Sequence, residues 1–230
     1  MTPDLLAALT AARAAKTPVV VATQLPGGAQ LLLPSPDAPA ELTEAADRAL
    51  LRDESGTVTI GNETWFLNAY NPPMRLIIVG AVHIAQAMMP MASALGLATT
   101  IIDPRRAFAS VDRFPNVTLS HEWPDDAMIE LNPDVRTAVV TLTHDPKIDD
   151  PGLDHALRSP AFYIGSLGSR RTHARRLDRL RALGHSDETL ARIRGPVGLN
   201  IHAVTAPEIA LSILAEIVAV RRNAPLPAKG

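Results

Sequence analysis

The spacing of apolar and polar residues divides the chain into two parts. In the first part, four short apolar segments joined in pairs by glycine-containing turns predict two β-hairpins, 19–22 with 30–33 and 57–60 with 64–69. Apolar residues at helical spacing predict one helix starting near Pro3 and another over 41–51. Residues 1–70 are therefore expected to form a small N-terminal α+β module.

The second part follows Asn71-Pro72-Pro73, where neither proline can donate to a strand ladder or continue a helix. Its apolar runs do not alternate with polar residues, which is typical of strands covered on both faces; these runs are 76–79, 98–102, 138–142 and 162–164. Helical patterns separate or follow them, over 84–95, 125–131, 150–157, 169–183 and 205–222. This alternation predicts an α/β fold, a Rossmann-like doubly wound parallel sheet, over residues 71–230.

Composition and charge exclude several classes of function. The chain of 230 residues has a formal net charge of -2 and a pI near 6.4, so it does not attract nucleic acid or anionic membranes electrostatically. It has no cysteine, which excludes disulfides, zinc-thiolate sites and thiol nucleophiles. The N-terminus lacks the basic and apolar regions of a signal peptide, and no stretch reaches membrane-spanning length. A cytoplasmic protein is expected.

The first candidate site is the turn after the predicted strand 76–79. Gly80 occupies the first glycine position of the dinucleotide-binding fingerprint and Ala85 the third, whereas Val82 replaces the second glycine and would crowd a pyrophosphate. Asp103 follows the next strand, where a carboxylate binds a ribose diol in such folds. Arg105, just after it, is a candidate phosphate contact. Two interpretations stay open: a ligand loop, or a tight turn with Asp103 as a helix cap.

The second candidate site is a glycine-containing segment between the strand 162–164 and a basic helix. Its backbone amides, hydroxyls and arginines are expected to converge on one anion, through Gly165, Ser166, Gly168, Ser169, Arg170 and Arg171. Two cations at a helix N-terminus oppose the helix dipole unless an anion compensates them. The alternative is that these arginines, with Arg175 and Arg176, form the solvated face of a surface helix.

Two histidines are further candidates for ligand contacts. His144 follows the strand 138–142 at the edge of the sheet where open α/β folds bind ligands, although it could equally cap a loop. His83 begins the helix after Gly80 and could donate to a phosphate or simply face solvent. No histidine and carboxylate cluster has spacing typical of a metal site, and no serine lies in a nucleophile elbow. Neither a metal site nor a serine nucleophile is therefore expected.

Taken together, these segments resemble the XdhC/CoxI family of accessory proteins for molybdenum hydroxylases. The matching segments are Leu76–Ala85, Ile101–Arg105, Arg113-Phe114-Pro115, Thr143-His144-Asp145, Phe162–Arg171, Ile193–Leu199 and Ala210–Glu216. Members commonly carry a glycine-rich N-terminal segment ending in a cysteine, which this chain lacks between Gly27 and Glu41, so it resembles a short form.

The resemblance implies that the protein binds the molybdenum cofactor, of the molybdopterin type, and assists its sulfuration and insertion into a hydroxylase such as xanthine dehydrogenase. The implied partners are the hydroxylase apoenzyme and a sulfurtransferase, since the chain has no thiol of its own. Two alternatives remain: an NAD(P)-dependent oxidoreductase, suggested by Gly80 and Asp103, and a docking scaffold without ligand. An apolar stripe on the last helix could form a homodimer interface or pack on the sheet; its members are Ile209, Ile213, Ile217 and Val220.

Overall fold

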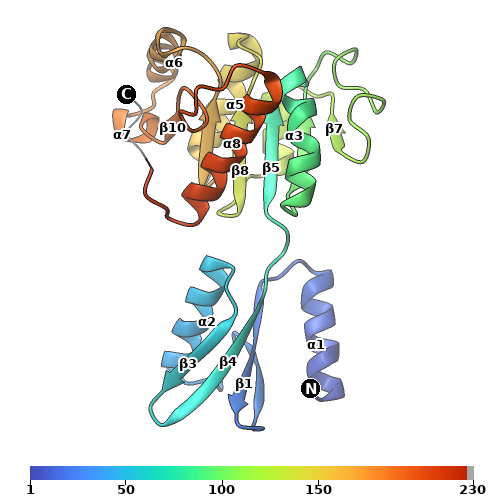
Figure 1. The fold of residues 1–230 in the computed structure, drawn as a ribbon, viewed down its shortest axis with the longest axis vertical. Coiled ribbons are helices and arrows are strands. Elements are labelled where there is room, and N and C mark those ends of the chain that lie inside the picture. Colours follow the sequence, from blue (N-terminus) through green and yellow to red (C-terminus); the bar gives the residue numbers. More distant parts are fainter. Residues whose placement is uncertain (227–230) are drawn as a thin grey trace. The chain divides into compact units, whose positions relative to one another are not determined.

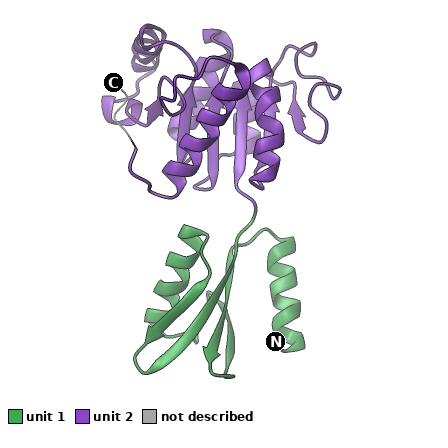
Figure 2. Cartoon of the chain, in the orientation of Figure 1, with its two compact units in different colours: residues 1–72 green, residues 73–230 purple. Residues whose placement is uncertain are grey.

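A computed structural model describes residues 1–226 and divides into two compact units, residues 1–72 and 73–230, which Figure 2 colours separately. The last four residues of the predicted second domain lie outside the described residues. The division falls between Pro72 and Pro73, beside the predicted boundary after residue 70. Each unit has its own hydrophobic core.

The first unit is a four-stranded antiparallel sheet with a helix on each face (Figure 1). The strand order is β2-β1-β4-β3, with bounds β1 Val19–Leu25, β2 Gln30–Leu33, β3 Gly56–Ile60 and β4 Glu63–Tyr70. Helix α2, Ala40–Arg52, buries Leu42 against Trp65 and its neighbours. Helix α1, Pro3–Ala14, packs Leu9 on the opposite face, and the Thr2 hydroxyl caps its N-terminus.

The second unit is a six-stranded sheet in which every paired strand is parallel. The order is β10-β9-β8-β5-β6-β7, with bounds β5 Arg75–Val79, β6 Ala98–Ile102, β7 Thr118–Ser120, β8 Thr137–Thr141, β9 Tyr163–Ser166 and β10 Ile193–Arg194. The first of these strands along the chain, β5, lies in the middle, so the sheet grows outward in both directions. This is the doubly wound arrangement that the sequence predicts.

Helices cover both faces of this sheet (Figure 1). Helices α3, His83–Ala94, and α8, Ala206–Arg221, pack on one face through apolar residues such as Met88 and Ile213. The other face carries α4, Pro124–Leu131, α5, Pro146–Arg158, and α6, Arg170–Ala182. A short helix, α7, Asp187–Leu190, adds Leu190 to this second core.

Three short elements were not predicted: β7, α7 and β10. Each has at most four residues, which is too short for a periodic pattern to show.

Helix α5 begins at Pro146, earlier than predicted, because the Asp145 side chain accepts from the Lys147 N–H at 3.0 Å and Pro146 suits the first helical position. No helix within residues 1–226 is long and apolar enough to cross a membrane.

The last helix confirms its predicted caps and decides the role of its apolar stripe. Thr205 and Glu208 form the predicted capping box at the N-terminus of α8. Ile213 and Ile217 are buried in the core, and Ile209 and Val220 pack against the same cluster. The stripe therefore packs on the core at the sheet, which is the second of the two alternatives that the sequence left open.

Candidate functional site

The strands of the second unit end in register, so the loops that follow them meet at one edge of the sheet. Val79 of β5 pairs with Ile102 of β6 and with Thr141 of β8, and Thr141 pairs with Ser166 of β9. The predicted site residues lie at or just after these strand ends. This carboxyl edge, with the crossover of the doubly wound sheet between β5 and β8, is where such folds bind ligands.

Gly80 allows the loop after β5 to pass closely beside the loop after β8. Its φ is +115°, and a Cβ there would lie 2.5 Å from Cγ2 of Thr143. Glycine is therefore required both by backbone conformation and by space. Val82 is half buried and packs against the core, so its side chain belongs to the packing of α3.

Asp103 is completely buried and uses all of its hydrogen-bonding capacity inside the protein. One carboxylate oxygen accepts from Ala81 N–H at 2.9 Å and Arg105 Nη2 at 2.8 Å, and the other from the backbone N–H and Nε of Arg105 at 3.0 and 2.9 Å. A carboxylate offers about four acceptor positions, and all four are filled. Asp103 therefore ties the end of β6 to the Gly80 loop and has no position left for a ribose diol.

Opposing effects act on the pKa of the Asp103 carboxyl. Burial raises it, but the Arg105 side chain and the backbone N–H groups of Ala81 and Arg105 outweigh burial, so the pKa lies below its ordinary value. The same pairing raises the pKa of Arg105, with further contributions from Asp145 and Asp149 across the edge. The pair is therefore ionised. Arg105 is also attracted by the carboxylates of Asp145 and Asp149, which follow β8.

Arg113 holds the other side of the Gly80 loop and was missed as a site residue. Its Nη1 donates to the carbonyl of Ala81 at 2.9 Å, and its Nη2 donates to Gln86 Oε1 on α3 at 2.7 Å. Because the Ala81 N–H donates to Asp103, both the N–H and the carbonyl of Ala81 are hydrogen-bonded. The sequence signal was the Arg113-Phe114-Pro115 motif, where Phe114 is buried and anchors the segment.

The structure places Gly165 and Ser166 differently from the prediction. Both lie within β9 and are buried, and the Ser166 hydroxyl is hydrogen-bonded to Thr141. A Cβ on Gly165 would lie 2.5 Å from Val197 Cγ2, so this glycine makes room for the loop after β10. These two residues shape the edge of the sheet, and their side-chain positions are not presented to an anion.

Gly168, Ser169, Arg170 and Arg171 do form the predicted turn into a helix. Gly168 has a φ of +140°, and the Ser169 hydroxyl caps α6 by accepting from Thr172 N–H at 3.2 Å. Ser169, Arg170 and Arg171 are exposed. The first N–H groups of α6 thus open to the surface beside two cations, which is the arrangement that binds anions at helix N-termini.

A cleft of ≈ 290 Å³ opens on one side of this turn. Leu167 and Arg170 form one wall, and the segment from Pro196 to Ala203, with Ile209, forms the rest. Its lining is mostly apolar, with Arg170, Asn200 and His202 as polar groups. Asn200 and His202 are exposed, and His202 has a φ of 57°. The segment before α8 therefore forms most of the wall of this cleft.

A buried hydrogen-bond network beneath this cleft fixes its outer segment. The Tyr163 hydroxyl donates to Glu216 Oε2 at 2.6 Å, and the backbone N–H of Gly198 donates to the same oxygen at 2.9 Å. Arg194 lies 3.8 Å from the other oxygen of Glu216. Burial and the neighbouring Glu216 carboxylate raise the pKa of Tyr163 well above its ordinary value. The network joins β9, α8 and the loop at Gly198.

Replacing Tyr163 by phenylalanine is expected to lower the free energy of unfolding by about 1–3 kcal/mol, because buried Glu216 loses a donor. Urea unfolding measures this change, and faster hydrogen exchange of the Gly198 N–H would report the loosened loop. Tyr70→Phe is the matched control, because Tyr70 is only half buried and its hydroxyl accepts from Asn68. Equal losses in both variants would contradict the special role of Tyr163.

The two candidate histidines lie apart from these buried networks. His83 is exposed at the first position of α3. His144 is exposed in the loop after β8, has a φ of 64°, and donates its backbone N–H to Asp149 Oδ2 at 3.1 Å. His144 also lines a second cleft, between α5 and α6. No group of three or more histidine, aspartate and glutamate side chains in the described part of the chain could hold a metal.

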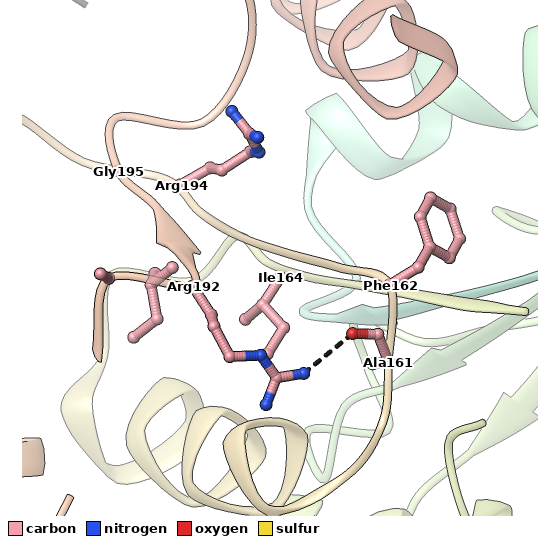
Figure 3. Close-up of a pocket in the computed structure, with 8 residues that line it drawn as sticks. Ala161, Phe162, Ile164, Arg192, Arg194 and Gly195 are labelled. Carbon is pink, nitrogen blue, oxygen red and sulfur yellow. Dashed lines mark hydrogen bonds between the residues drawn. The ribbon is translucent and has the colours of Figure 1, made fainter. Parts of the chain in front are cut away.

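A third cavity, of ≈ 350 Å³, lies beside the edge strand β10 and is shown in Figure 3. Its most prominent polar group, Arg192, donates to the carbonyl oxygens of Leu157, Ser159 and Ala161 at the end of α5. These bonds satisfy carbonyls that a helix C-terminus leaves free. Arg192 therefore has a structural role, and this cavity is lined by none of the predicted site residues.

A parallel sheet wound in both directions, with a glycine turn, an arginine-bearing helix N-terminus and a cleft at its carboxyl edge, defines a Rossmann-type domain. The family model described as the XdhC Rossmann domain matches residues 76–217, well over half of the chain. The chain belongs to the XdhC family.

Named relatives agree with this assignment. The molybdenum cofactor insertion chaperone PaoD of Escherichia coli K12 is 37% identical over 161 residues, 68% of this chain and 44% of PaoD. A Bacillus subtilis 168 protein described as a probable xanthine dehydrogenase subunit is 30% identical over 159 residues, 69% of this chain and 46% of that protein. The chain thus spans less than half the length of these relatives.

A solved structure shares the fold. A Bacillus halodurans protein described as a xanthine dehydrogenase matches with a TM-score of 0.72 and 22% sequence identity, over 99% of this chain and 66% of that one. At this identity the likeness concerns the fold alone.

Proposed function

We propose that this chain binds the molybdenum cofactor and assists its sulfuration and insertion into a molybdenum hydroxylase such as xanthine dehydrogenase. The observation that carries the proposal is the cleft beside the N-terminus of α6, with Arg170 in its wall. The names of the relatives PaoD and the B. subtilis protein support the cofactor and the client class.

The residues at the cleft fit such a ligand. A molybdopterin carries a flat heterocycle and an anionic phosphate, and the cleft offers apolar walls together with an arginine beside open helix N–H groups. Its ≈ 290 Å³ is close to the lower limit of roughly 300 Å³ for small-ligand pockets. It would therefore hold part of such a cofactor.

In this proposal the chain protects and positions the cofactor without reacting with it. The bound cofactor supplies the redox centre that the client hydroxylase uses. Arg170 and the first N–H groups of α6 would hold the anionic end, and the segment 196–203 would shield the heterocycle from water. Because the chain has no cysteine, sulfur for the cofactor comes from a partner sulfurtransferase.

Arg170→Ala tests the site when wild type and variant are purified from a host that makes molybdopterin. We expect wild type to retain pterin, detected by fluorescence after oxidation, and the variant to retain at least about tenfold less, since a charge-assisted contact is lost. Arg181→Ala is the control, because it removes the same side chain from the other end of α6. The control should keep its pterin.

Two outcomes would count against the proposal. A wild-type protein that carries no pterin and does not bind supplied cofactor would exclude cofactor binding. If Arg170→Glu with Arg171→Glu leaves hydroxylase maturation intact in a strain deleted for the native gene, a docking scaffold without ligand explains the protein better.

A further inference from the structure

A second cleft, of ≈ 200 Å³, lies between α5 and α6 on the other face of the sheet from α8. Its lining comprises one histidine, one aspartate, three arginines, a threonine and a proline: His144, Asp149, Arg175, Arg176, Arg179, Thr172 and Pro146. It shares no residue with the cleft at Arg170. The N-terminal turns of two helices, each of 13 residues, contribute to this lining.

Arg176 in this cleft is buried in a way that is unusual for a charged side chain. It is only 1% exposed, and its Nη2 donates to the carbonyl of Leu167 at 2.8 Å. Its Nε and Nη1 are buried and have no hydrogen-bond partner among the described residues. Buried donors without acceptors are costly, and a guanidinium carries five N–H groups in a fixed plane. Two donors of Arg176 are thus left without an acceptor among the described residues, and an anion in the cleft could supply one.

The neighbouring carboxylates do not meet this need. Asp149 Oδ2 lies 3.7 Å from Arg176 Nη2, beyond hydrogen-bond distance, and the carboxylate accepts from the Thr143 hydroxyl and from the N–H groups of Thr143 and His144. Asp150 pairs with Arg179. Burial lowers the pKa of Arg176 and raises that of Asp149, so burial outweighs the attraction within this pair.

The charges around the cleft favour an anion. Arg175, Arg176 and Arg179 face Asp149 and Asp150, which leaves an excess of one positive charge before His144 is counted. Arg175 and His144 are exposed, and no side-chain hydrogen bond or ion pair occupies Arg175 among the described contacts. A planar guanidinium matches two oxygens of a tetrahedral oxyanion.

We propose that the cleft between α5 and α6 is a binding site for a phosphate group, in which the buried donors of Arg176 and the exposed Arg175 bind its oxygens. The Thr172 side chain and His144 form the rim on either side. Gly168 lies close to this site: a Cβ there would lie 3.1 Å from Thr172 Cγ2 and 3.7 Å from Arg176 Nη2, so a side chain at this position would crowd Thr172. The site is separate from the proposed pterin cleft, so either can exist without the other.

The full chain, purified without phosphate from a host that makes no molybdopterin, provides the test. Calorimetry with inorganic phosphate and, separately, with a nucleoside monophosphate should detect binding. Equal affinities identify the phosphate group alone as the ligand, and tighter binding of the ester identifies a phosphate ester. We expect Arg175→Ala to weaken binding about tenfold, as for one charge-assisted hydrogen bond, and Arg181→Ala to leave it unchanged.

Arg176→Lys should abolish binding, since a point charge cannot replace the fork of N–H groups. Because Arg176 is buried and also donates to the Leu167 carbonyl, Arg176→Lys could disturb the fold as well as the site. A second measurement therefore uses the wild-type protein. In the wild-type protein, the Nε–H resonance of Arg176 should shift on addition of phosphate. The proposal is overturned if neither ligand binds at millimolar concentration, if Arg175→Ala binds as tightly as wild type, or if the Arg176 resonance does not move.

Discussion

Asp103→Asn is expected to lower the free energy of unfolding by about 2–4 kcal/mol at neutral pH, the cost of removing one partner from a buried, fully bonded pair. Asparagine keeps the volume but has one acceptor oxygen instead of two and no charge. The N–H of Ala81 and the three Arg105 nitrogens that donate to Asp103 then compete for that oxygen. Arg105 has a side chain 37% exposed and can recover water, so the loss stays below that of a fully enclosed ion pair.

The effect of Asp103→Asn should depend on pH in a defined direction. The pKa of Asp103 is lowered in the folded protein, so its contribution to stability is complete above the unfolded value of about 3.9 and is lost as the pH falls through the folded pKa. The difference between wild type and variant should be constant from pH 7 to about pH 5 and shrink below about pH 4.

Urea unfolding at several pH values measures this difference. Asp178→Asn provides the control, because Asp178 makes an exposed pair with Arg181 in which its side chain is 75% exposed, and such pairs contribute about 0–1 kcal/mol. A difference between wild type and Asp103→Asn that stays constant down to pH 3 would show that the charge of Asp103 is not what holds the Gly80 loop.

Gly80→Ala is the second large effect that we expect, a loss of about 2–5 kcal/mol that combines backbone strain with overpacking. The φ of +115° disfavours any residue with a Cβ, and that Cβ would lie 2.5 Å from Thr143 Cγ2. Thermal or urea unfolding gives the magnitude. The same variant should also lose pterin, because the loops after β5 and β8 must move apart.

A double variant separates the two causes of this loss. Thr143→Ser removes Cγ2 but keeps the hydroxyl that donates to Asp149 at 2.7 Å. Combined with Gly80→Ala, it should restore the overpacking part, about 1–3 kcal/mol, and leave the backbone strain. Gly56→Ala is the control, since it has no unfavourable φ and nothing within 4 Å of the added Cβ. If Gly80→Ala is as stable as this control, the close approach of the two loops is not required.

The sequence predicted the fold class well because its signals are local and repeated. The apolar runs of β5, β6 and β8 and the amphipathic helices between them need no knowledge of distant residues. The sequence singled out Gly80 and Asp103 for the same reason, since each occupies a fixed place after a strand. The pattern could not show that the carboxylate oxygens of Asp103 accept hydrogen bonds from Arg105 and from Ala81, which is 22 residues away.

The second glycine segment shows where such prediction fails. Gly165 follows an apolar run in the sequence and resembles a phosphate-loop glycine. In the folded chain, its missing side chain instead leaves room for Val197, a contact that the sequence does not show. Arg176 was grouped with its neighbouring arginines on a solvated face. Helical spacing places it one turn before Leu180, which is fully buried, yet its charge conceals this inward position.

The two ends of the parallel sheet have a consequence for self-association. The edge strands β7 and β10 have three and two residues, so each presents very few unpaired N–H and C=O groups to a neighbouring chain. Long, regular edges are the templates on which sheets of different molecules join into aggregates. By ending its sheet on strands this short, the domain offers little template for such growth.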